Sequence, residues 1–128
     1  MDTSYVFGQK GEKLALEYLI EKKYIILERN YRSGKNEIDI IARNSGEVVF
    51  IEVKTRSTDV FCEPETAVTK EKQRPIIKGA NSYILRNNIN EEARFDIIAI
   101  VTNEDGTKIN HIENAFTPMP YYRIGRFK

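Results

Sequence analysis

Apolar residues recur along this chain with two different periods, and the change of period divides it into elements. In residues 7–24 they return every three or four positions, which predicts a first helix whose apolar face includes Leu14, Ala15, Tyr18 and Leu19. Runs rich in branched and aromatic residues predict strands at 24–32, 36–43, 47–56, 94–101 and 107–116. The turn-forming trio Asn44-Ser45-Gly46 lies between two of these strands and predicts a β-hairpin.

A second helix is predicted at residues 69–87, with Thr69 as its N-cap and an apolar stripe of Ile76, Ile77, Ala80, Tyr83 and Ile84. Pro75 leaves two alternatives, because the helix either starts at Thr69 and is kinked at Pro75 or starts near Arg74. Residues 57–68 contain Pro64 and show no clean period, so we expect a loop there.

The predicted order is α-β-β-β-α-β with one further strand. A meander followed by a helical crossover implies an α/β fold in which helices flank a mixed central sheet. Residues 1–117 are expected to form a single domain. Residues 118–128 contain two prolines and no period, and we expect them to form a C-terminal tail that could be flexible.

Composition agrees with one folded domain, since 41% of the 128 residues are hydrophobic and 30% are charged. The formal net charge is only +1, so a nucleic-acid ligand would need basic residues gathered on one face. Cys62 is the single cysteine, which excludes an internal disulfide. No secretory signal and no apolar run of about 20 residues is evident, so we expect a cytoplasmic protein without a membrane span.

The hairpin brings carboxylates together. A turn of two or four residues gives the same register, in which Asp39 faces Glu52 with Cβ atoms about 5 Å apart. In that register Glu37 faces Lys54, and all four side chains share one face of the sheet. The other face would hold Ile38, Ile40, Ile51 and Val53. A turn of three residues would slip the register by one.

Like charges opposite one another destabilise a sheet, so the pairing of Asp39 with Glu52 needs a reason. One reason is a hard divalent cation, which prefers oxygen ligands, with Lys54 beside it to orient or deprotonate a water. The alternative is an ordinary solvated face. Glu12 falls inside the apolar arc of the first helix, where a carboxylate is costly unless it is paired or bound to a cation. Its alternative role is that of an acidic residue favoured by the helix dipole.

Several segments together resemble the bacterial YraN family over nearly the whole chain: GQKGE (8–12), Asn30-Tyr31-Arg32, NEIDIIA (36–42), VFIEVKTR (49–56), and RFDIIAI (94–100) with HIENAF (111–116). That family is similar to the PD-(D/E)XK nuclease superfamily, near the archaeal Holliday-junction resolvases and the restriction endonucleases. The motif D-x(n)-E-x-K is short, but its combination with a first-helix Glu and this element order is more specific. Ile38 stands where the proline of the motif would be.

The resemblance implies a restriction-endonuclease-like core and phosphodiester hydrolysis with Mg²⁺ or Mn²⁺ as cofactor. It implies that Asp39, Glu52 and the backbone carbonyl of Val53 hold the metal, and that Glu12 binds it directly or through water. Lys54 would position the nucleophilic water, so the expected catalytic residues are Glu12, Asp39, Glu52 and Lys54. Glu37 could assist, although its expected role is that of a neighbour of Lys54. The expected substrate is DNA, branched DNA included, and a homodimer is possible by analogy with the resolvases.

Binding of DNA requires cations around the site. A stripe spaced by four residues on the second helix contains Lys70, Arg74 and Lys78, and a group near the hairpin contains Arg32, Lys35, Arg43 and Arg56. The alternative is that these charges are simply solvated. His111 is expected to be structural or exposed rather than a ligand, and Phe61 is a candidate for substrate contact or dimer packing.

Two other functions stay open at this point. One is a module with the nuclease fold that binds nucleic acid without cutting it. The other is an interaction protein with an incidental acidic face. Retention of Glu12, Asp39, Glu52 and Lys54 together favours an enzyme, because a module that does not cut has no need for opposed carboxylates.

Overall fold

The computed structural model describes residues 3–57 and 68–118, with side chains from Gln9 onward except that of Ser57. The elements are α1 (Thr3–Glu21), β1 (Ile25–Ser33), β2 (Asn36–Asn44), β3 (Glu47–Ser57), α2 (Lys70–Arg86), β4 (Glu92–Asn103) and β5 (Gly106–Phe116). Every predicted helix and strand is confirmed, with small differences at the ends. Phe61, Cys62 and most of the predicted loop and tail lie outside the described residues.

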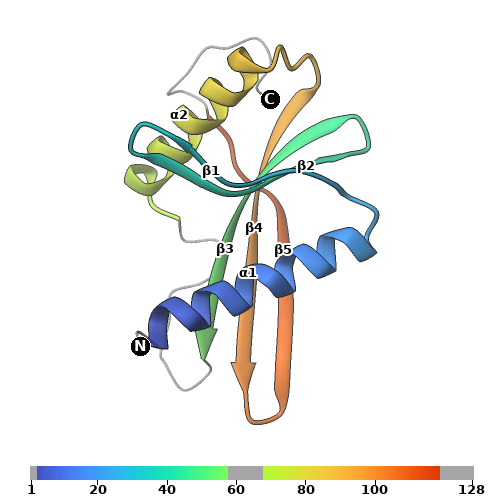
Figure 1. The fold of residues 1–128 in the computed structure, drawn as a ribbon, viewed down its shortest axis with the longest axis vertical. Coiled ribbons are helices and arrows are strands. Elements are labelled where there is room, and N and C mark those ends of the chain that lie inside the picture. Colours follow the sequence, from blue (N-terminus) through green and yellow to red (C-terminus); the bar gives the residue numbers. More distant parts are fainter. Residues whose placement is uncertain (1–2, 58–67, 119–128) are drawn as a thin grey trace.

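The five strands form one sheet in the order β1-β2-β3-β4-β5. β3 and β4 are parallel, and the other neighbours are antiparallel, so the predicted mixed sheet is confirmed. In Figure 1, α1 crosses the lower part of β3, β4 and β5, whereas α2 lies beside the upper part of the sheet near β1. The helix between β3 and β4 is the crossover that a parallel pair requires.

Two hydrophobic clusters fill the two faces of the sheet. One contains the apolar stripe of α2 together with Ile38, Ile41, Val48 and Phe50. The other contains Ala15, Leu16 and Leu19 of α1 together with Ile40, Ala42, Val49 and Ile51. Each helix therefore covers one face, as the alternation of strand side chains requires.

Turn chemistry determines the hairpin register. Ser45 and Gly46 both have positive φ, at 50° and 80°, as the central residues of a two-residue hairpin loop do. Asn44 consequently pairs with Glu47 and Arg43 with Val48, as predicted. The β2–β3 ladder ends at the Ile40–Ile51 pair, however, so the expected Asp39–Glu52 and Glu37–Lys54 pairs are not formed. At the start of the second predicted helix, the Thr69 side chain accepts the backbone N–H of Lys72 at 3.3 Å and caps α2. The helix therefore begins before Pro75 and contains it, and the alternative start near Arg74 is wrong.

The predicted face for Ile38 is wrong. Ile40 packs in the α1 cluster as expected, but Ile38 packs in the α2 cluster, so the alternation changes between these two residues. On the β1 side the ladder passes from the Arg29–Ile40 pair to the Tyr31–Ile38 pair, and the intervening Asn30 has a φ of 50°. β1 is thus irregular at the position opposite Asp39, where the alternation of β2 also changes.

Among the residues that the structure describes, no helix has the combination of length and apolar character that crossing a membrane requires.

Candidate metal and phosphodiester site

Asp39 lies where β2 and β3 separate. The ladder between these strands ends at the Ile40–Ile51 pair. One residue further along β2, the carboxylate oxygen Oδ2 of Asp39 accepts the backbone N–H of Val53 at 2.8 Å. The Asp39 side chain thus takes the place that a ladder hydrogen bond would otherwise fill, and it is held beside β3 by the backbone itself.

Glu52 and Lys54 flank Val53 on β3. Val53 packs against the α1 cluster, so its two neighbours point to the opposite face, toward α2. Burial raises the pKa of Glu52, and the positive charges of Lys54 and of Lys72 on α2 oppose that shift. The Oε2 atom of Glu52 is buried and has no hydrogen-bond partner among the described residues. A buried carboxylate oxygen without a donor is costly, so this atom is suited to a cation or to a water.

Glu12 is brought toward the strands by a close contact of the preceding residue. A Cβ atom on Gly11 would lie 2.0 Å from Oγ1 of Thr55, so α1 can approach β3 this closely only with glycine at this position. Glu12 is half-buried, whereas Glu17 and Glu21 on the same helix are exposed, as the helical wheel predicts. Burial raises the pKa of Glu12, Glu37 raises it further, and Arg29 opposes the shift.

The carboxylates act on one another electrostatically. Burial raises the pKa of Asp39 to about 7; the hydrogen bond from Val53 opposes this rise, and the negative charges of Glu12, Glu52 and Glu37 add to it. Glu37 also lies 3.7 Å from the guanidinium of Arg32, which balances part of its charge. The charges of three other carboxylates therefore act on Asp39, whereas sequence reasoning singled out only Glu12 and Glu52 as its partners in holding a metal.

The donor set fits a cation held by two carboxylates. Within residues 3–57 and 68–118, no three His, Cys, Asp or Glu side chains are arranged so that they could hold a metal ion together. Mg²⁺ commonly takes only one or two carboxylates and keeps several waters, so Asp39 and Glu52 with a backbone carbonyl match its chemistry. Glu12 is not part of a three-carboxylate group in this arrangement.

Residues 11–100 match the sequence model of the family described as "Uncharacterised protein family UPF0102". The chain belongs to the UPF0102 family. A UPF0102 protein of Christiangramia forsetii is 49% identical over 109 residues, which cover 85% of this chain and 92% of that protein. UPF0102 proteins of Alkaliphilus oremlandii and Phocaeicola vulgatus are 47% and 45% identical over 112 residues, covering 85% and 88% of this chain and 96% and 93% of those proteins.

The YraN resemblance is thereby confirmed at the level of the UPF0102 family. The matched segment runs from the middle of α1 to β4. It contains Glu12, Asp39, Glu52 and Lys54, so the whole candidate site of this UPF0102 chain lies in the part that defines the family.

The predicted basic residues do not form one group. Lys70, Arg74 and Lys78 are all exposed on α2, at the spacing that places them along one side of the helix. Arg43, however, lies next to the hairpin turn and forms an ion pair with Glu91. Because Arg43 pairs with Val48, which is eight residues from Arg56 along β3, these two arginines lie about 26 Å apart along the sheet. The predicted cluster of Arg32, Lys35, Arg43 and Arg56 is therefore wrong as a single cluster.

One buried polar network of the UPF0102 chain was missed by sequence reasoning. Arg94 donates to both carboxylate oxygens of Asp96, at 2.9 Å from Nε and 2.8 Å from Nη2. Nε2 of His111 lies 2.7 Å from Oδ2 of Asp96, and the Tyr18 hydroxyl lies 3.0 Å from Nδ1 of His111. Burial disfavours the charge of Asp96, but its hydrogen bonds to His111 and Arg94 outweigh burial, and its pKa is lowered. His111 is thus structural, and the spacing of Arg94 and Asp96 on one strand face was the available signal.

Proposed function

We propose that this chain is a metal-dependent endonuclease of the PD-(D/E)XK type that hydrolyses phosphodiester bonds in DNA. The observation that carries the proposal is the hydrogen bond from the backbone of Val53 to Asp39, which places that carboxylate beside the residues Glu52 and Lys54. Two separate strands thus supply the acidic residues and the lysine that the motif requires, at the point where the strands separate.

Asp39, Glu52 and the carbonyl of Val53 would hold Mg²⁺ or Mn²⁺, since the carbonyl of a strand residue points to the same side as its N–H. The bound ion supplies Lewis acidity and a lowered pKa of the attacking water. Lys54 positions that water and balances charge that develops on the phosphate. Glu12 acts through water rather than as a direct ligand. The raised pKa values of Asp39 and Glu52 support the proposal, because a cation would relieve the repulsion and desolvation that raise them.

A module that binds nucleic acid without cutting it is the second candidate. It is favoured by one observation, namely that the described residues include no group of three possible metal-binding side chains. Both candidates predict contact with DNA through α2, but only the first predicts that phosphodiester bonds are broken.

The experiment that separates the candidates is incubation of the protein with single-stranded, duplex and branched DNA in Mg²⁺ or Mn²⁺. We expect the wild type to cleave at least one substrate and Asp39→Asn and Lys54→Ala to be inactive. Glu17→Gln is the control for Asp39→Asn, because it also neutralises one carboxylate, in this case an exposed one on α1 outside the proposed site. Metal-independent binding without cleavage of any substrate would favour the module and contradict the nuclease.

A further inference from the structure

α2 concentrates positive charge. Its seventeen residues include one acid, Glu71, and five basic residues, Lys70, Lys72, Arg74, Lys78 and Arg86. The whole chain has a net charge of only +1. The helix is therefore strongly basic on a nearly neutral molecule, and this asymmetry attracts a polyanion to this face.

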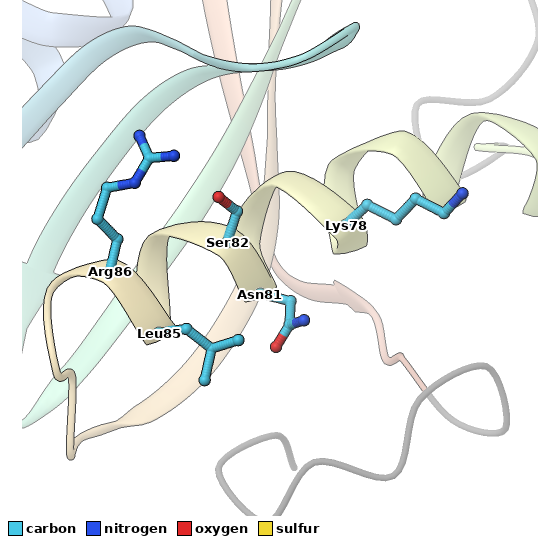
Figure 2. A pocket seen from close by; sticks show the side chains of 5 residues that line it. All are labelled: Lys78, Asn81, Ser82, Leu85 and Arg86. Atoms are coloured by element: carbon cyan, nitrogen blue, oxygen red, sulfur yellow. The ribbon is translucent and has the colours of Figure 1, made fainter.

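An open groove lies at the C-terminal part of this basic helix. It has a volume of about 610 Å³ and is lined by Lys78, Asn81, Ser82, Leu85 and Arg86. Figure 2 shows the side chains of Lys78 and Arg86 toward opposite ends of this segment, with Asn81 and Leu85 extending from one side of the helix and Ser82 and Arg86 from the other. Eight residues of helix separate the two cations, which is about 12 Å along the axis.

The middle of the groove is neither basic nor uniformly polar. Leu85 keeps 66% of its surface exposed, which is high for a large apolar side chain. Beside it, the amide oxygen of Asn81 is buried and accepts no hydrogen bond from the described residues. Ser82 is fixed by hydroxyl contacts with Tyr31 at 3.2 Å and Ser33 at 2.9 Å, so this part of α2 is tied to β1. The groove thus combines an exposed apolar side chain and an amide with two cations.

We infer that this groove binds an unpaired nucleotide of the DNA substrate. The phosphates on the two sides of this nucleotide contact Lys78 and Arg86. Its base packs on Leu85, with the Asn81 amide at the base edge. The bases of an intact duplex are stacked inside the helix and reach such a groove only when they are extruded. This inference rests on the proposed function for the identity of the substrate, and it narrows that substrate to DNA with an unpaired segment.

Charge also argues against the chain's own C-terminal segment as the occupant. Residues 119–128 carry three basic residues, Arg123, Arg126 and Lys128, and no acidic residue. A segment of that charge would be repelled by Lys78 and Arg86, whereas a phosphate backbone is attracted.

Fluorescence anisotropy tests the groove without any need for cleavage. Full-length protein in EDTA is titrated onto a labelled single-stranded oligonucleotide and onto a blunt duplex of the same length. We expect Leu85→Ser and Asn81→Ala each to weaken binding of the single strand about fivefold or more. Fivefold is about the smallest effect that loss of one base contact produces. Binding of the duplex should be unchanged. Arg86→Gln should weaken binding of both and lower the salt slope for the single strand by about 0.7.

Lys108→Gln, an exposed cation on β5, is the matched control and should bind as the wild type does. Thermal unfolding of each variant confirms that it is folded. If Leu85→Ser weakens binding of single strand and duplex equally, or of neither, the groove does not bind an unpaired nucleotide. The nuclease proposal would remain intact. Selective loss of single-strand binding in a protein that cuts no DNA would instead support the groove and overturn the nuclease.

Discussion

The environment of Asp39 distinguishes this site from an ordinary acidic surface. Its carboxylate accepts the backbone N–H of Val53, which favours the charged form. Burial nevertheless raises its pKa to about 7, with Glu12, Glu52 and Glu37 adding to the rise. Burial and like charges disfavour the ionised form of this carboxyl group unless it binds a cation. Protonation and cation binding each have a measurable consequence.

The first consequence is a pH dependence of stability in the absence of divalent ions. The folded pKa of Asp39 lies above the unfolded value of 3.8, so the folded state binds more protons between about pH 4 and 7. Its contribution to stability is fully present below pH 3.8 and is lost as the pH rises through 7. We expect Asp39→Asn to remove this loss, so that the difference in unfolding free energy between variant and wild type grows from pH 4.5 to pH 8 in urea titrations with EDTA. A difference that is constant across this range would show that Asp39 has an ordinary pKa.

The second consequence concerns added metal. Mn²⁺ that binds the folded state raises the melting temperature by mass action, and it requires ionised carboxylates. We therefore expect a larger increase at pH 8 than at pH 5.5 in differential scanning fluorimetry. Glu52→Gln should reduce the increase and Glu17→Gln should preserve it. An equal increase in all three proteins would place Mn²⁺ elsewhere.

At the scale of elements, local signals were sufficient wherever local geometry decides the structure. Ser45-Gly46 determined the hairpin register, and Thr69 determined the start of α2. The sequence could not reveal that Asp39 reaches the backbone of Val53, because this contact forms where the β2–β3 ladder ends, one residue beyond the Ile40–Ile51 pair. The face of Ile38 was mistaken because a period-2 pattern assumes an unbroken strand, and the alternation changes between Ile38 and Ile40.

The docking of α1 can be tested at Gly11. We expect Gly11→Ala to destabilise the protein by about 1–3 kcal/mol, the usual cost of overpacking, because its Cβ would meet Oγ1 of Thr55 at 2.0 Å. Thr55→Ala removes that oxygen, so the double variant should recover part of the loss. Chemical unfolding of the four proteins in a double-mutant cycle measures the coupling. Additive effects would mean that the helix does not depend on this contact.

At the scale of the whole molecule, long-range polar contacts hold the sheet and α1 together. The Arg94–Asp96–His111 network joins β4 and β5, and through Tyr18 and Tyr24 it reaches α1 and the start of β1. Tyr18 and His111 are 93 residues apart in the chain, so no pattern of neighbouring residues could have predicted their contact. Asp96 pairs with Ile51, next to Glu52, but its carboxylate binds Arg94, His111 and the backbone of Asn114, and we assign the network a role in stability.

Asp96→Asn should therefore be costly. The substitution removes the negative charge nearest to the buried guanidinium of Arg94. That guanidinium keeps Glu47 and Glu113 at 3.2 Å, so we expect a loss of about 1–3 kcal/mol. Asp105→Asn, a change of the same kind in the exposed β4–β5 turn, should have little effect. Urea unfolding compares the two variants. A loss below about 1 kcal/mol for Asp96→Asn would show that the network is not a major source of stability.

The proposed nuclease function depends on phosphodiester hydrolysis at Asp39, Glu52 and Lys54. The most direct measurement is the single-turnover cleavage rate of an end-labelled DNA carrying an unpaired branch, in Mg²⁺ or Mn²⁺, with protein in excess. We predict cleavage by the wild type and by Glu17→Gln, no cleavage in EDTA, and a rate at least about a hundredfold lower for Asp39→Asn. Cleavage that persists in Asp39→Asn, or a wild type that binds this DNA and leaves it intact in both metals, would contradict the account.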